Sequence, residues 1–103
     1  MSRIEIILEH LKSSPADSFL QHALALEYIK LGDDNSARLL FEEILKRDPA
    51  YTGSYYHLSK LLERQGETEL AIAWLEKGMQ ACKQAGDNHS FNELQAAYED
   101  LTF

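Results

Sequence analysis

The side chains that could act in catalysis or bind a metal are few and widely spaced in this sequence. Histidines stand at positions 10, 22, 57 and 89, and no two of them have the short spacing of metal ligands on one helix. Cys82 is the only cysteine, and no histidine lies three or four residues from it. Adjacent acids such as Glu42 and Glu43 could act as general acid and base, but a solvated helix face explains them more simply. We therefore expect no metal, no cofactor and no enzymatic activity.

Composition and charge narrow the classes of partner. Of the 103 residues, 45% are hydrophobic and 26% are charged, as in an ordinary globular protein. The net charge of −7 repels nucleic acid and anionic lipid surfaces. The five glycines are scattered, so no phosphate-binding loop is present. There is neither a long apolar stretch nor a signal-peptide pattern, and a single cysteine fits a reducing compartment, so we expect a cytoplasmic protein.

A repeat organises the chain. When residues 15–48 are compared with residues 49–82, an offset of 34 positions, six identities appear within one repeat length. Glycine, proline and alanine dominate them, and these residues end helices or allow close packing. The identical pairs are Pro15 and Pro49, Ala16 and Ala50, Leu24 and Leu58, Gly32 and Gly66, Ala37 and Ala71, and Glu42 and Glu76.

Apolar residues recur at the three-and-four spacing of amphipathic helices throughout the chain. Ser2 with Glu5, and Ser90 with Glu93, form the pattern of a capping box at the start of the first and last helices. The sequence therefore predicts an all-α single domain with about six helices. Its predicted parts are an N-terminal capping helix over 1–14, repeats over 17–49 and 51–83, and a closing helix over 89–102.

The repeat resembles the tetratricopeptide repeat. Ala37, Phe41 and Pro49 match the second-helix pattern of that family, and Leu24 and Tyr28 match its first helix. In the second copy Tyr55 replaces the usual tryptophan, whereas Gln21 departs from it in the first copy. The resemblance, closest to small stand-alone bacterial members, implies a right-handed stack of antiparallel helical hairpins. Small residues at positions 25, 37, 59 and 71 are expected where paired helices cross.

By the same resemblance, the first helices of successive repeats line a concave groove that receives a peptide or a partner helix. One family variant clamps a carboxylate with lysine and asparagine, but His22 and Leu26 occupy those places here, so that specificity is not expected. The expected groove residues are Phe19, His22, Leu26, Ile29, Lys30, Tyr56, Lys60, Glu63 and Arg64.

Two functions follow from this interpretation. The first is an adaptor that binds another protein or peptide, with Leu26 and Tyr56 as apolar anchors and Lys60 and Arg64 beside them for acidic groups. The alternative is a self-associating structural module, a homodimer for example, because Leu101 and Phe103 lie on the closing segment. Cys82 is expected to be a packing residue and not a reactive thiol.

Overall fold

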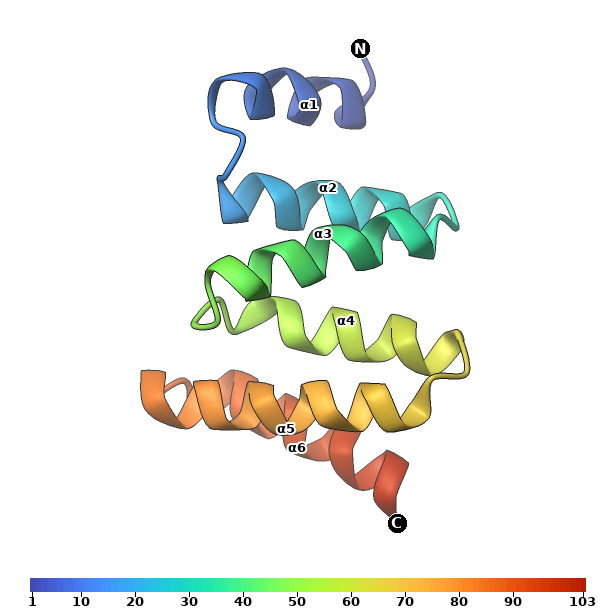
Figure 1. Cartoon of the computed structure of the whole chain (residues 1–103), viewed down its shortest axis with the longest axis vertical. Helices are drawn as coiled ribbons and strands as arrows, with labels where there is room; N and C mark the ends of the chain where they lie inside the picture. Colours follow the sequence, from blue (N-terminus) through green and yellow to red (C-terminus); the bar gives the residue numbers. More distant parts are fainter. The chain divides into compact units, whose positions relative to one another are not determined.

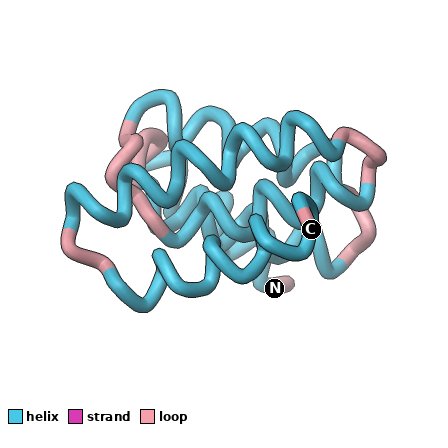
Figure 2. The backbone as a smooth tube through the Cα atoms, turned by 90° about the horizontal axis from the view of Figure 1, so that it is seen from below, coloured by secondary structure: helices cyan, strands magenta, loops and turns pink.

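The computed structural model describes residues 1–103 and contains six helices and no strand (Figures 1 and 2). Two compact units divide the chain, Met1–Asp48 and Pro49–Phe103, and each holds three helices. None of the helices is long and apolar enough to cross a membrane. The helices are α1 (Arg3–Ser13), α2 (Ser18–Lys30), α3 (Asp34–Arg47), α4 (Gly53–Arg64), α5 (Thr68–Ala85) and α6 (Asn88–Thr102).

In the N-terminal unit, α2 and α3 form an antiparallel hairpin and α1 packs against α2 (Figure 1). Ala25 on α2 and Ala37 on α3 are fully buried, as expected of small residues at a helix crossing. Helix α1 is held more lightly, because Ile7 is its only buried residue. The rest of the core of this unit consists of Leu24, Phe41, Ile44 and Leu45.

In the C-terminal unit, α4 and α5 form the second hairpin, and α6 packs mainly on α5 (Figure 1). Gly78 on α5 marks the closest approach. A Cβ atom at this position would lie 2.7 Å from Cγ of Tyr55 and 2.8 Å from Cδ1 of Leu94. Glycine is therefore required where α4, α5 and α6 meet. The other large buried side chains are Leu58, Leu61, Leu62 and Leu75.

The turns inside the two hairpins are the same. Gly32 and Gly66 have φ angles of 79° and 80°, which favour glycine. After α2, the N–H of Asp33 donates to the carbonyl of Tyr28 at 2.9 Å. The N–H of Glu67 donates to the carbonyl of Leu62 at the same distance after α4. These bonds satisfy carbonyls that a helix end leaves unpaired, and they confirm the predicted role of the glycines.

Of the two capping boxes predicted at helix starts, one is confirmed and one is wrong. At α1 the capping box of Ser2 and Glu5 is confirmed, with both hydrogen bonds at 3.1 Å. At α6 the predicted capping box of Ser90 and Glu93 is wrong, because Asp87 is the N-cap and accepts from the N–H of Ser90 at 3.1 Å. Helix α5 ends at Ala85, which leaves Asp87 as the residue before the next helix.

Candidate functional site

The nine residues predicted to bind a partner lie on the first helices of the two hairpins. Those on α2 belong to the N-terminal unit, and those on α4 belong to the C-terminal unit. Part of each set lines a hollow of its own unit. Helix α2 carries Phe19, His22, Leu26, Ile29 and Lys30, and α4 carries Tyr56, Lys60, Glu63 and Arg64.

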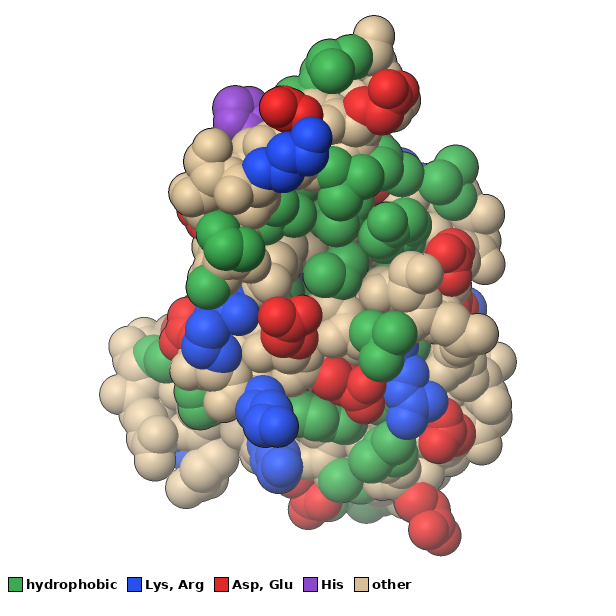
Figure 3. Space-filling view, turned by 45° about the horizontal axis from the view of Figure 1, so that its top comes forward, with side chains coloured by type: hydrophobic (Ala, Val, Ile, Leu, Met, Phe, Trp, Pro, Cys, Tyr) green, Lys and Arg blue, Asp and Glu red, His purple; other side chains and the backbone are tan.

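A hollow of about 280 Å³ lies between α1 and α2, and we call it the α1–α2 hollow. Its apolar part is formed by Phe19, Ala23 and Leu26. The ring of Phe19 is exposed, with 70% of the residue's surface open to solvent. Figure 3 shows hydrophobic side chains gathered on the N-terminal unit, in the upper part of the view. The complete lining is Arg3, Phe19, His22, Ala23, Leu26, Glu27 and Lys30.

The rim of the α1–α2 hollow is positively charged. Glu27 is 15% exposed and pairs with Arg3 of α1 at 3.4 Å and with Lys30 of α2 at 3.0 Å. Two cations thus surround one carboxylate. The His22 ring lies 5.5 Å from the Phe41 ring in an edge-to-face arrangement, which orients this wall of the hollow. An apolar side chain that carries an acidic group fits this combination.

A second hollow, of about 250 Å³, lies between α4 and α6, and we call it the α4–α6 slot. Tyr56 and Lys60 line it from α4. The Lys60 ammonium lies 5.9 Å from the centre of the Tyr56 ring and 3.7 Å from the carboxylate of Glu63. From α6 the slot is lined by Glu93, Ala96, Ala97 and Asp100.

Several lining residues were not predicted from the sequence. Arg3 lies on α1, and the slot takes four residues from α6. The four α6 positions have the spacing of one helix face, which is a visible signal. The spacing alone does not say which helix this face of α6 lies against. The structure shows that it lies beside α4. Conversely, Ile29, Glu63 and Arg64 line neither hollow.

The environments of His57 and Cys82 limit what they can do. Burial lowers the pKa of His57, with Arg64 acting in the same direction and Glu93 opposing it. The ring lies against Tyr56, at 5.7 Å between ring centres. Burial and the charge of Asp87 raise the pKa of the Cys82 thiol. Because the thiol is also buried, Cys82 is confirmed as a packing residue.

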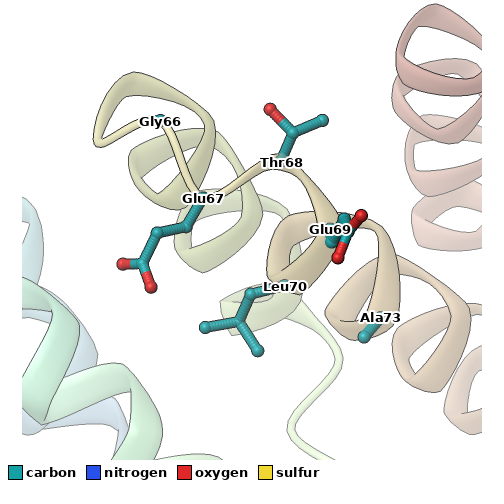
Figure 4. A pocket seen from close by; sticks show the side chains of 6 residues that line it. All are labelled: Gly66, Glu67, Thr68, Glu69, Leu70 and Ala73. Atoms are coloured by element: carbon teal, nitrogen blue, oxygen red, sulfur yellow. The ribbon is translucent and has the colours of Figure 1, made fainter.

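A wider hollow of about 710 Å³ opens at the turn between α4 and α5 (Figure 4). The side chains of Glu67 and Leu70 point to one side of the turn, whereas Thr68 points away from them. Glu67 and Glu69 bring negative charge to the start of α5, where an anion would otherwise be favoured. This hollow therefore offers no combination of anchors comparable with the other two.

Fold and surfaces together define a helical-repeat protein with a partly apolar hollow beside the first helix of each hairpin. The family pattern of the tetratricopeptide repeat matches residues 20–51 and 52–84. The chain belongs to the tetratricopeptide repeat family, and its predicted all-α fold of this type is confirmed.

The chain is similar to several known proteins, and the share of each protein that it covers differs. It is 39% identical to a tetratricopeptide repeat domain protein of Salinibacter ruber, with a TM-score of 0.80 and coverage of 82% of this chain and 94% of that one. The TPR2B domain of yeast Sti1, solved in complex with pHsp70, has a TM-score of 0.88 at 17% identity, covering 96% of this chain and 79% of that one. Mouse aspartyl/asparaginyl beta-hydroxylase is 29% identical over 77 residues.

The match to the mouse hydroxylase covers 75% of this chain, which spans only about a tenth of the enzyme's length. Proteins built from tetratricopeptide repeats are generally protein–protein interaction modules and non-enzymatic scaffolds. The short match to a large enzyme is compatible with that general role, because it lies over the repeat-containing part of this chain.

Proposed function

We propose that this chain is a non-enzymatic adaptor that binds a peptide segment or a helix of another protein on α2 and α4. The observation that carries the proposal is the α1–α2 hollow, an apolar concavity beside the exposed ring of Phe19. Fully burying a phenylalanine side chain contributes about 1.5–3 kcal/mol. Because Phe19 is largely exposed in the free chain, a partner that covers it and fills the hollow would gain most of this free energy.

The contact residues that we propose are those expected from the sequence. On α2, the half-buried Leu26 forms part of the hollow's apolar wall, and Lys30 contributes to its positive rim. On α4, the half-buried Tyr56 presents its ring to the α4–α6 slot. The TPR2B domain of yeast Sti1, which shares this fold, is known in complex with pHsp70. The full proposed set is Phe19, His22, Leu26, Ile29, Lys30, Tyr56, Lys60, Glu63 and Arg64.

The test is affinity capture from a native cell extract with the wild-type chain and the variant Leu26→Ala with Tyr56→Ala. We expect the double variant to lose the captured partner, because a few apolar and aromatic anchors carry most of the energy of an interface. The control is Leu39→Ala on α3, since Leu39 is 68% exposed and lines neither hollow. Circular dichroism should show unchanged helix content in all variants. Equal capture by the double variant and wild type would refute the proposal.

Self-association is the alternative function, and light scattering on the same variants separates it from adaptor binding. An adaptor should keep its molar mass when Leu26 and Tyr56 are replaced. A molar mass above that of one chain, falling only when Leu101 and Phe103 are replaced by serine, would favour the self-associating module instead.

A further inference from the structure

We propose that the partner segment presents a lysine or arginine whose side chain enters the α4–α6 slot. This inference rests on the proposed function and adds the chemistry of the bound segment. It differs from the expectation drawn from Lys60 and Arg64, which pointed to an acidic segment at α4.

The first argument is the shape of the slot. Glu93, Ala96, Ala97 and Asp100 follow one another at the spacing of a single helix face and line the slot from α6. The two alanines keep the middle of this face low, and the ring of Tyr56 lines the slot from α4. A long aliphatic stem can lie along such a surface while its charged end reaches further out.

The second argument is the placement of charge along the slot. Carboxylates stand at both ends of its α6 side, on Glu93 and Asp100. Lys60 is the only cation of the lining, and it lies 3.7 Å from Glu63, outside the slot. Asp100 forms no ion pair in the structure. Glu93 lies 3.8 Å from His89, and its charge raises the pKa of the half-buried His57. A basic side chain therefore meets carboxylates that no lysine or arginine of the chain neutralises.

The third argument is the charge of α6 as a whole. Helix α6 carries Glu93, Glu99 and Asp100 and contains no lysine or arginine. With a net charge of −7 on the whole chain, the field around this face attracts basic segments and repels acidic ones. Complementary charges of this kind determine which partner is accepted and how fast it associates.

The test uses three fluorescently labelled peptides of equal length. All three have leucine at the same positions, and their remaining positions are lysine, glutamate or glutamine. Fluorescence anisotropy measures the binding of each peptide to the full chain at low and moderate salt. We expect the lysine peptide to bind about tenfold more tightly than the glutamine peptide, and the glutamate peptide to bind most weakly.

Variants locate the binding of the lysine peptide. Ala96→Leu fills the slot without changing charge, and because Ala96 is exposed on a helix the fold should tolerate it. We expect it to weaken binding about tenfold. Glu93→Gln with Asp100→Asn removes both slot carboxylates and should weaken binding by a similar factor. The matched control is Glu76→Gln with Glu99→Gln, which removes two exposed carboxylates outside the slot and should have a smaller effect.

Each contrary outcome refutes the inference. Equal effects of the slot pair and the control pair would mean that net charge alone attracts the peptide. Unchanged binding to Ala96→Leu would exclude the slot as the site. If Leu26→Ala abolishes binding while the slot variants do not matter, the inference fails and the proposed function stands. If none of the three peptides binds, the inference fails, and the capture experiment with Leu26→Ala and Tyr56→Ala decides the proposed function separately.

Discussion

The hairpins α2–α3 and α4–α5 each have a side-chain hydrogen bond to the carbonyl of the proline before their first helix, but the donor side chains differ. In the first, Nε2 of Gln21 donates to the carbonyl of Pro15 at 3.1 Å. In the second, the hydroxyl of Tyr55 donates to the carbonyl of Pro49 at 2.6 Å. Both residues occupy the position where the family usually has tryptophan. The donor and its carbonyl partner recur at the same places in the repeat, although the donor is the amide of Gln21 in the first hairpin and the phenol of Tyr55 in the second.

The surroundings of the two donors differ. Oε1 of Gln21 also accepts from the guanidinium of Arg47 at 2.7 Å, so the first hairpin has a polar network here. In the second, the ring of Tyr55 lies 6.1 Å from that of Trp74 and directly beside Gly78. One repeat earlier, the position of Gly78 is held by the buried Ile44. The two hairpins thus share a backbone arrangement but fill it differently. The first pairs Gln21 on α2 with the larger Ile44 on α3, and the second pairs the larger Tyr55 on α4 with Gly78 on α5.

The largest expected effect comes from the pair Ile44 and Gly78. Ile44→Ala should destabilise the fold by about 2–5 kcal/mol, because it leaves a cavity in the core. Gly78→Ala should also destabilise it, by about 1–3 kcal/mol, because the added methyl would overlap Tyr55 and Leu94. Urea unfolding followed by circular dichroism measures both. If Gly78→Ala raises stability, as helix propensity alone predicts, the close approach of α5 to α4 and α6 is wrong.

A smaller effect is expected at the two donors. Tyr55→Phe removes only the hydroxyl and should cost about 0.5–1.5 kcal/mol, the usual net value of one hydrogen bond. Gln21→Leu removes both the bond to Pro15 and the bond from Arg47, so its cost should be larger, about 1–3 kcal/mol. The same urea titrations test this. A smaller loss for Gln21→Leu than for Tyr55→Phe would show that the polar network does not stabilise the first hairpin.

The smallest effect concerns the starts of the second helices. Asp33 caps α3, and hydrogen bonds from the Ser36 side chain and backbone lower the pKa of its carboxyl group from the ordinary 3.8. Glu67 occupies the equivalent position before α5, and its side chain makes no cap hydrogen bond. Because the folded state holds the Asp33 carboxylate at a lowered pKa, its stabilisation is present above 3.8 and lost as pH falls through the folded pKa.

We therefore expect Asp33→Ala to lower the unfolding midpoint at neutral pH and to have less effect at an acidic pH below the lowered pKa of Asp33. Glu67→Asp should raise the midpoint at neutral pH, since aspartate is a good N-cap residue. Thermal unfolding at both pH values measures these changes. A loss for Asp33→Ala that is the same at both pH values would contradict the role given to its carboxylate.

The sequence predicts the fold better than the binding surface, and particular residues show why. Gly32 and Gly66 end α2 and α4 through local backbone conformation, which a sequence pattern captures. The start of α6 was misassigned because Asp87 and Ser90 both have the side chains of N-cap residues, and the end of α5 decides between them. Whether a side chain caps a helix therefore depends on where the preceding helix stops.

The surfaces depend on contacts between helices that are distant in sequence. Leu26 and Lys30 were predicted from their positions on α2, but the pairing of Glu27 with Arg3 requires α1 to lie beside α2. Likewise, Tyr56 was predicted from α4, whereas Glu93 and Asp100 become its neighbours only when α6 packs in the C-terminal unit. Such tertiary contacts set the charge around each anchor, and a one-dimensional pattern does not contain them.

The central claim is that a partner is bound on the first helices of the hairpins. The most direct test is nuclear magnetic resonance of the isotopically labelled chain, titrated with the partner recovered by capture. The account predicts that the largest amide shifts fall on α2 and α4 around Phe19, Leu26 and Tyr56, with further shifts on α6 around Ala96. Shifts confined to α3 and α5, with the amides of α2 and α4 unchanged, would contradict it.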